Sequence, residues 1–307
     1  MISLQRFFPR SVKRLLRRMV LSVAYYSEGL ASTIRDRFLE DKGEIWEFRR
    51  CLTDGKPYFG PVMASRQGVA DRHGYMQGII EMECSGGDKA YYRILEIGSW
   101  AGGSAITWSD AIKKFNGGNG SVICVDPWIR YTQRDFSKAK VCEIMDEALK
   151  TGEIIDLFFH NIRASGHEDV VRLIKGRSDE ILPLLRPNQF DLAFVDGNHS
   201  YQQVLKDLEN ATPLVRDGGI LCGDDLELQV PVIDVKHAKR NSEVAYLLDP
   251  KSNEWFHPGV TLAVADWFGA VSAWEGFWAM RKRGHGWEKV VSEKLDLKDV
   301  RVPEHLM

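Results

Sequence analysis

The chain has 307 residues, 44% hydrophobic and 27% charged, and this composition excludes a disordered or a fibrous protein. Its 41 basic and 43 acidic residues nearly cancel, so the chain lacks the overall positive charge of a nucleic-acid-binding protein. Cys124 and Cys222 lie in short apolar runs, and five cysteines cannot all pair, so we expect reduced thiols and a cytoplasmic protein. No apolar run approaches the ~20 residues of a membrane-spanning helix.

The first 40 residues predict a basic amphipathic helical extension. Six basic residues precede the first acidic one, Glu28. At ~100° per residue, the apolar side chains share one helix face and the basic ones lie opposite. The apolar face comprises Val12, Leu15, Leu16, Met19, Val20 and Val23, and the basic face Arg10, Lys13, Arg14 and Arg17. This helix either packs on the core or on a second copy in a homo-oligomer, which we favour, or lies through residues 9–24 on the anionic inner face of a membrane.

Residues 41–88 predict a helical cap, because they combine helical stretches with glycine and proline punctuation. From residue 89 onward, short apolar runs alternate with helical stretches, which is typical of a doubly wound, mostly parallel α/β sheet. The expected strands are 92–97, 122–125, 170–174, 192–195 and 220–222, and the expected helices 104–114, 139–150, 154–164, 179–185 and 201–214. Residues 277–282 and 287–291 predict two further strands joined by a hairpin turn. Ligands of such sheets bind beyond the carboxyl ends of the strands.

A glycine-rich turn follows the first expected strand. The residues expected to contact a cofactor here are Glu96, Gly98, Ser99, Gly102, Gly103 and Ser104. Trp100 stands where a dinucleotide-binding turn needs its second glycine, so a nicotinamide or flavin dinucleotide is disfavoured. The spacing suits a cofactor without phosphate that presents an amino acid end and a ribose, such as S-adenosylmethionine. The alternative is a tight turn that binds no ligand.

Two later strand ends add candidate cofactor contacts. Asp126 ends the second strand, where a carboxylate can accept the ribose hydroxyls, and Trp128 can stack on the adenine. After the third strand, Ser178 can hydrogen-bond the adenine edge. In the alternative interpretation, Trp128 is a core residue and Asp126 caps the following segment.

Carboxylates also end the fourth and fifth strands. Asp196 can converge with Asp224 and Asp225 if these strands are neighbours, because adjacent strands lie ~4.8 Å apart. Three carboxylates together repel one another unless a cation or protons compensate, so the pattern predicts Mg²⁺, with Mn²⁺ or Ca²⁺ as substitutes. His199, three residues after Asp196, is the candidate general base. The alternative is that the later aspartates are caps and bind no metal.

Taken together, these motifs resemble class I S-adenosylmethionine-dependent methyltransferases, most closely the branch of the macrocin-type sugar O-methyltransferases. The motifs are Glu96-Ile97-Gly98 with Gly102-Gly103, Val125-Asp126 with Trp128, the run from Val195 to Tyr201, and Gly218-Gly219 with Asp224-Asp225. The resemblance extends from about residue 93 to residue 282. It implies a seven-stranded Rossmann-like sheet, bound S-adenosylmethionine, Mg²⁺ at Asp196, Asp224 and Asp225, and His199 at the position of the family's proposed base.

The expected activity is metal-dependent transfer of a methyl group to a hydroxyl of a sugar, glycan or natural-product acceptor by the domain 89–307. Residues 226–258 form the expected substrate loop, and Trp255, Phe256 and His257 could form an acceptor wall or anchor the loop. Two alternatives belong to other classes. One is an NAD-type oxidoreductase on a similar sheet, and the other is a non-catalytic cofactor-binding scaffold recruited by the N-terminal helix.

Overall fold

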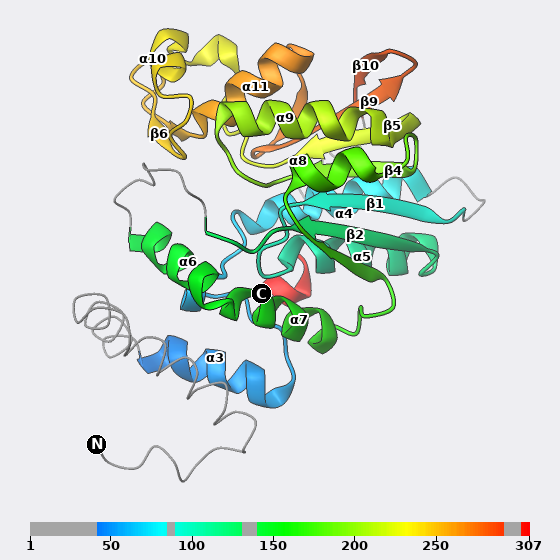
Figure 1. Ribbon diagram of the computed structural model, residues 1–307, viewed down its shortest axis with the longest axis vertical. Coiled ribbons are helices and arrows are strands. Elements are labelled where there is room, and N and C mark those ends of the chain that lie inside the picture. Colours follow the sequence, from blue (N-terminus) through cyan, green and yellow to red (C-terminus); the bar gives the residue numbers. More distant parts are fainter. Residues whose placement is uncertain (1–41, 85–89, 131–139, 292–301) are drawn as a thin grey trace.

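The computed structural model describes residues 42–84, 90–130, 140–291 and 302–307 (Figure 1). The predicted amphipathic extension at residues 1–40 lies outside these residues. Within the described ranges, no helix is long and apolar enough to span a bilayer.

One central sheet organises the chain, with the strand order β10-β9-β5-β4-β1-β2-β3. Its parallel strands are β1 (Tyr92–Ile97), β2 (Gly120–Asp126), β3 (Val171–Lys175), β4 (Phe190–Val195) and β5 (Val215–Gly223). The order turns back at β1, so consecutive crossovers run to both sides of the first strand. The prediction of a doubly wound, mostly parallel sheet is confirmed.

Among the described residues, the sheet has eight strands, one more than expected, and the additional strand lies at its antiparallel edge. β9 (Phe277–Arg283) pairs antiparallel with β5, and β10 (Gly286–Lys289) returns along its outer edge as the predicted hairpin. The short β8 (Ser272–Trp274) pairs with the first three residues of β9. Its three residues are too few to give a recognisable alternation in the sequence.

Alternate strand residues build a core on each face of the sheet. On β1, Ile94 faces a core that includes Trp108 and Ile80, whereas the next residue, Leu95, faces a second core with Leu208 and Val264. Both strand residues are fully buried. Neighbouring side chains of a strand point to opposite faces of the sheet, and here both faces are buried. These strands therefore appear in the sequence as continuous apolar runs.

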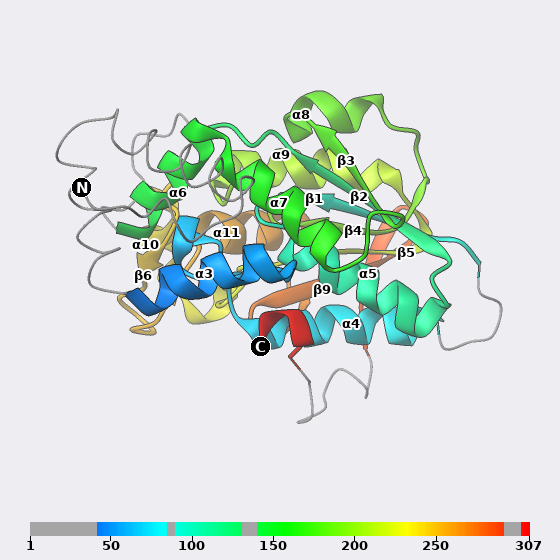
Figure 2. The ribbon, with the colours of Figure 1, turned by 90° about the horizontal axis from the view of Figure 1, so that it is seen from below.

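Helices cover the sheet on both sides, with α4 and α5 on one side and α8 and α9 on the other (Figure 2). The helices of the sheet crossovers are α5 (Gly103–Asn116), α6 (Lys140–Thr151), α7 (Glu153–Ala164), α8 (Ser178–Ile181), α9 (Tyr201–Ala211) and α11 (Pro258–Phe268). Short 3₁₀ turns continue α8 and α9, which the sequence predicted as single longer helices.

The segment expected as a helical cap contains α3 (Lys42–Asp54) and α4 (Ala70–Cys84). Asn161 of α7 joins this segment to the main domain. Its Nδ2 donates to the carbonyls of Tyr58 (3.1 Å) and Ala101 (2.9 Å), and its Oδ1 accepts the amide of Tyr58. Tyr58 and Met76 lie in the same core as β1. The exact domain boundary at residues 88 and 89 stays a prediction.

The expected substrate loop contains structure of its own. It comprises a 3₁₀ turn (Val230–Val232), α10 (Val235–Arg240), and the two-stranded β6 (Leu247–Leu248) and β7 (Trp255–Phe256). α11 begins directly after it. A side chain at Gly259 would collide with the carbonyl of His199 and the amide of Tyr201, so only glycine lets α11 pack against the turn after β4.

Candidate functional site

The candidate site lies where the carboxyl ends of β1, β2, β4 and β5 meet. Ile97 of β1 pairs with Val125 of β2 and Val195 of β4, and Val195 also pairs with Gly223 of β5. The predicted site residues that follow these strands therefore leave the sheet at one edge. A Cβ at Gly98 would overlap the carbonyl of Asp196, so the glycine turn and the turn after β4 are in close contact.

The carboxylate of Asp126 is hydrogen-bonded to the main chain of the glycine turn. Its Oδ2 accepts the amides of Ser99 (2.9 Å) and Trp100 (3.1 Å), and its Oδ1 accepts the amide of Trp128 (2.7 Å). Three of the roughly four lone-pair positions of a carboxylate are thus used by the main chain. Burial raises the pKa of Asp126, although these amides oppose the shift. The structure therefore shows Asp126 as a clamp between two loops, with little capacity left for ribose hydroxyls.

The turn itself needs glycine at two positions. Gly98 (φ +85°) and Gly102 (φ +87°) have left-handed backbone conformations, and Gly102 packs against Phe158. Gly103 packs against the side chain of Gln67 from the cap. Trp100, between these glycines, donates its indole N–H to the carbonyl of Ala64 at 3.1 Å. The cap and α7 thus both pack against the turn.

Three other expected cofactor contacts are enclosed by protein. Glu96 is fully buried beneath the turn, and burial raises its pKa to about 8, so it is predominantly a neutral acid at pH 7. Ser99 and Ser104 are buried as well. These three side chains pack under the turn and are not accessible. A ligand at the turn would therefore contact its main-chain atoms.

Trp128 and Ser178 have protein partners in this structure. The indole of Trp128 is buried, donates to the carbonyl of Trp100 (2.9 Å) and packs edge-on against Phe158. Ser178 donates its hydroxyl to Asp207 Oδ1 at 2.6 Å. Trp128 therefore has the core position that was the alternative to adenine stacking.

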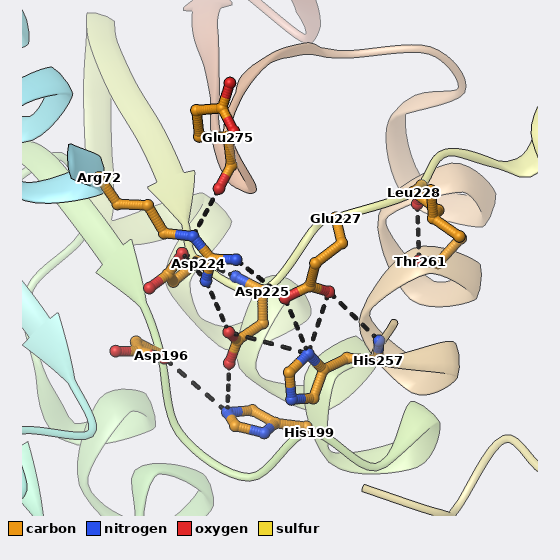
Figure 3. Close-up of polar contacts among 10 residues, drawn as sticks. All are labelled: Arg72, Asp196, His199, Asp224, Asp225, Glu227, Leu228, His257, Thr261 and Glu275. Carbon is orange, nitrogen blue, oxygen red and sulfur yellow. Dashed lines mark hydrogen bonds and ion pairs between the residues drawn. The ribbon is translucent and has the colours of Figure 1, made fainter. Parts of the chain in front are cut away.

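The acidic residues after β4 and β5 form one cluster with a cation from the cap (Figure 3). Arg72 of α4, almost fully buried, donates Nη1 to Asp224 Oδ1 and to Asp225 Oδ1, both at 2.8 Å. Its Nη2 donates to Glu227 Oε1 at 2.9 Å. A guanidinium is always charged, so Arg72 compensates part of the repulsion among the carboxylates. The sequence pattern predicted a metal ion for this role.

Two histidines complete the cluster. His199 Nε2 lies 3.0 Å from Asp225 Oδ2 and 3.8 Å from Asp196 Oδ1. The His257 ring lies edge-to-face with that of His199 at 4.7 Å, and its Nδ1 lies 3.1 Å from Glu227 Oε2. His199, Asp225 and His257 each offer a donor atom within 4.8 Å of the others.

The electrostatics of the cluster follow from burial and charge. Burial opposes ionisation of Asp225, but the neighbouring His257, His199 and Arg72 outweigh it and lower the pKa of Asp225. Burial and the nearby Asp225 raise the pKa of Asp224. Burial also opposes the charge of His199, yet Asp225 and Asp196 raise the pKa of His199 well above its usual value.

The sequence alone does not reveal the contacts of Arg72, Glu227 and His257 with this cluster. Arg72 lies 152 residues before Asp224, in a helix with no motif, and no local pattern connects them. Glu227 could have been noticed, because it continues the acidic run after β5.

The three predicted aspartates do not form an all-oxygen cation site in this arrangement. Arg72 already holds one oxygen each of Asp224 and Asp225, and the second oxygen of Asp225 faces His199. Mg²⁺ prefers oxygen ligands only. Asp196, Asp224 and Asp225, as they are arranged in this structure, therefore do not fit an all-oxygen Mg²⁺ site.

Comparisons with known proteins place these features in context. A family model described as a methyltransferase domain matches residues 95–226. Among solved structures, cofactor-bound Rv0187 from MTB is similar with a TM-score of 0.43 and 18% identity, covering 80% of this chain and 94% of that one. A putative caffeoyl-CoA O-methyltransferase from Staphylococcus aureus gives 0.45 and 15%, covering 82% and 98%. The O-methyltransferase NovP gives 0.47 and 16%, covering 68% and 80%. The comparison with curated proteins finds no match.

Proposed function

We propose that the chain is an S-adenosylmethionine-dependent O-methyltransferase that acts on a hydroxyl group of a sugar, a glycan or a natural product. The observation that carries the proposal is the contact between the glycine turn after β1 and the Asp196–His199 turn after β4. The first is the usual place of a cofactor in such a sheet, and the second carries groups that accept protons. The match of residues 95–226 to a methyltransferase domain supports the same conclusion.

S-adenosylmethionine would supply a methyl group already activated on a sulfonium. The tasks left to the chain are to position the acceptor oxygen and to accept its proton as the new bond forms. Asp196 and His199 line the same hollow at the end of β4, together with Asp224 and Val260. Both side chains are partly exposed and lie 3.8 Å apart. We assign the acceptance of the hydroxyl proton to this pair, and because Asp225 and Asp196 raise the pKa of His199, this imidazole accepts a proton only at a pH above that raised value.

An aromatic pair beside the cluster is our candidate for the acceptor wall. Tyr246 and Trp255 stack at 5.3 Å and are both exposed, and Tyr246 also contacts the ring of His257 at 4.8 Å. A flat apolar surface of this kind suits a sugar ring or a phenol. Phe256, in contrast, is fully buried with Ile233 and Leu262 and anchors the loop. A cation near the acceptor oxygen would lower the pKa of the hydroxyl, and the proposal includes such metal dependence.

A methyl-transfer screen tests this function. The full-length protein is incubated with S-adenosylmethionine and sugars, nucleotide sugars, glycans or catechols, with and without EDTA, and S-adenosylhomocysteine is quantified. We expect one acceptor class to give product and EDTA to reduce it. Tight cofactor binding without transfer to any hydroxyl would instead favour a cofactor-binding scaffold. Binding of a nicotinamide dinucleotide in place of S-adenosylmethionine would favour an oxidoreductase.

A further inference from the structure

We propose that His199, Asp225 and His257 bind a first-row transition-metal dication, with Glu227 as the residue that positions His257. The inference deepens the proposed function and rests on it, because the cation would serve the proposed methyl transfer. It replaces the all-carboxylate magnesium set expected from the sequence with a set of two imidazoles and one carboxylate.

The first argument is the geometry of the donor atoms. They all lie within 4.8 Å of one another, close to the ~4.2 Å that separates two donors on opposite sides of an ion with ~2.1 Å bonds. Asp225 Oδ2 lies 3.0 Å from His199 Nε2, and the rings of His199 and His257 lie edge-to-face with centroids 4.7 Å apart. The three residues come from the turn after β4, the end of β5 and the start of α11, so three separate elements converge.

The second argument is the support around these residues. Glu227 Oε2 lies 3.1 Å from His257 Nδ1, and the other ring nitrogen of His257 points toward the side of His199 (Figure 3). A carboxylate on the far nitrogen of a histidine is the usual arrangement around a metal-binding imidazole, because it fixes the tautomer and the ring direction. Arg72 fixes Oδ1 of Asp225 and so directs Oδ2 toward His199.

The third argument is the charge of the cluster. Asp196, Asp224, Asp225 and Glu227 lie together, and Arg72 is the permanently charged side chain that pairs with three of them. A dication would offset much of the remaining negative charge. Imidazole nitrogen favours zinc, iron, cobalt or nickel over magnesium, and a set of two histidines and one carboxylate leaves coordination positions open for an acceptor oxygen. With His199 bound to the cation, Asp196 is the member of the proton-accepting pair that remains available.

Co²⁺ is the probe, because its visible absorption reports its ligands. The chelator-treated, full-length protein is titrated with Co²⁺ and followed by absorption and calorimetry. We expect one Co²⁺ per chain, at least ~10-fold weaker binding in His199→Ala and His257→Ala, and ~10–100-fold weaker binding in Glu227→Gln. Mg²⁺ at equal concentration should not displace Co²⁺. His285→Ala, which changes an exposed histidine on the hairpin, should bind as the unchanged protein does.

Asp224→Asn separates this set from the all-carboxylate one, because Asp224 belongs only to the all-carboxylate set. The amide oxygen of the variant can still accept a hydrogen bond from Arg72. We expect this variant to retain Co²⁺ binding, and thermal unfolding of each metal-free variant shows whether it is folded. Absence of Co²⁺ binding, unchanged affinity in folded His257→Ala, or displacement of Co²⁺ by equal Mg²⁺ would overturn the inference. Cofactor binding and methyl transfer are measured separately, so a chain that binds Co²⁺ without transferring methyl groups contradicts the proposed function and leaves the metal site intact.

Discussion

His199 is the residue on which the proposed chemistry depends most directly. It contacts Asp225 and lies beside Asp196, while the glycine turn is held by other residues. We therefore expect His199→Ala to reduce turnover by ~10²–10⁴-fold and to leave the affinity for S-adenosylmethionine unchanged. Steady-state kinetics and calorimetry measure the two quantities, with His285→Ala as the control. Full activity in His199→Ala would remove this residue from the chemistry.

Gly98 tests the contact between the two turns. Alanine there is strained by φ +85° and overlaps the carbonyl of Asp196, whereas Gly55 has φ +65° and open space around it. Backbone strain alone costs ~1–3 kcal/mol of the free energy of unfolding. We expect Gly98→Ala to lose more stability than Gly55→Ala and also to lose cofactor affinity. Chemical denaturation and calorimetry compare the two variants, and equal losses with intact cofactor binding would show that the close contact is unimportant.

For single residues, the sequence predicted where the site residues lie along the strands, but not which groups their side chains contact. Asp126 is the last residue of β2 and Asp196 directly follows β4, as expected, because an apolar run followed by an acid marks a strand end. That Asp126 accepts three main-chain amides depends on the path of two separate loops. The pairing of Arg72 with Asp224 depends on how α4 packs across the sheet, and no local pattern carries that information.

Among the elements, α4 and the loop after β5 are joined by Arg72. Replacing it with methionine leaves the partly buried Asp224 and Asp225 without this cation, and breaking a buried ion pair costs ~3–5 kcal/mol as an upper figure. We expect Arg72→Met to lose about this much of the free energy of unfolding. Arg66→Met is the control, because the exposed pair of Arg66 with Glu44 contributes only ~0–1 kcal/mol. Equal losses in denaturant titrations would contradict the bridging role.

The contact of α8 with α9 predicts a pH dependence. Burial raises the pKa of Asp207 to about 6, although Ser178 and Gln203 donate hydrogen bonds to it. Between its unfolded pKa of 3.8 and about 6, the folded state binds more protons than the unfolded state, so stability falls as pH rises through this window. The loss is about 3 kcal/mol at most. We expect Asp207→Asn to remove it, as seen in denaturation curves from pH 4 to 7. Parallel curves for the two proteins would contradict the assignment.

The strands and helices with long apolar patterns were predictable, because burial on both faces leaves a continuous run in the sequence. β1 is found at the expected residues, and the ends of most other elements shift by a few residues. The missed elements are short. β6, β7 and β8 have two or three residues each, and α10 has six, so neither period can be recognised in them.

For the molecule as a whole, the alternation of strands and helices indicated the fold class, but the arrangement in space needed the structure. The order around β1 brings the ends of β4 and β5 together, as the aspartate hypothesis required. The cap, which carries no motif, contacts the glycine turn through Gln67 and through the carbonyl of Ala64, and it supplies Arg72 to the acidic cluster. These contacts join residues 36 positions apart in the case of Ala64 with Trp100 and 152 positions apart in the case of Arg72 with Asp224, so no local pattern predicts them.

A crystal structure with S-adenosylhomocysteine and Co²⁺ tests the account most directly. We expect the cofactor along the glycine turn after β1, with its sulfur facing the hollow lined by Asp196 and His199. We expect the metal between His199, Asp225 and His257. A cofactor bound away from the carboxyl ends of β1 and β4, or soaked crystals in which this edge of the sheet binds neither component, would contradict the proposed methyl transfer at this site.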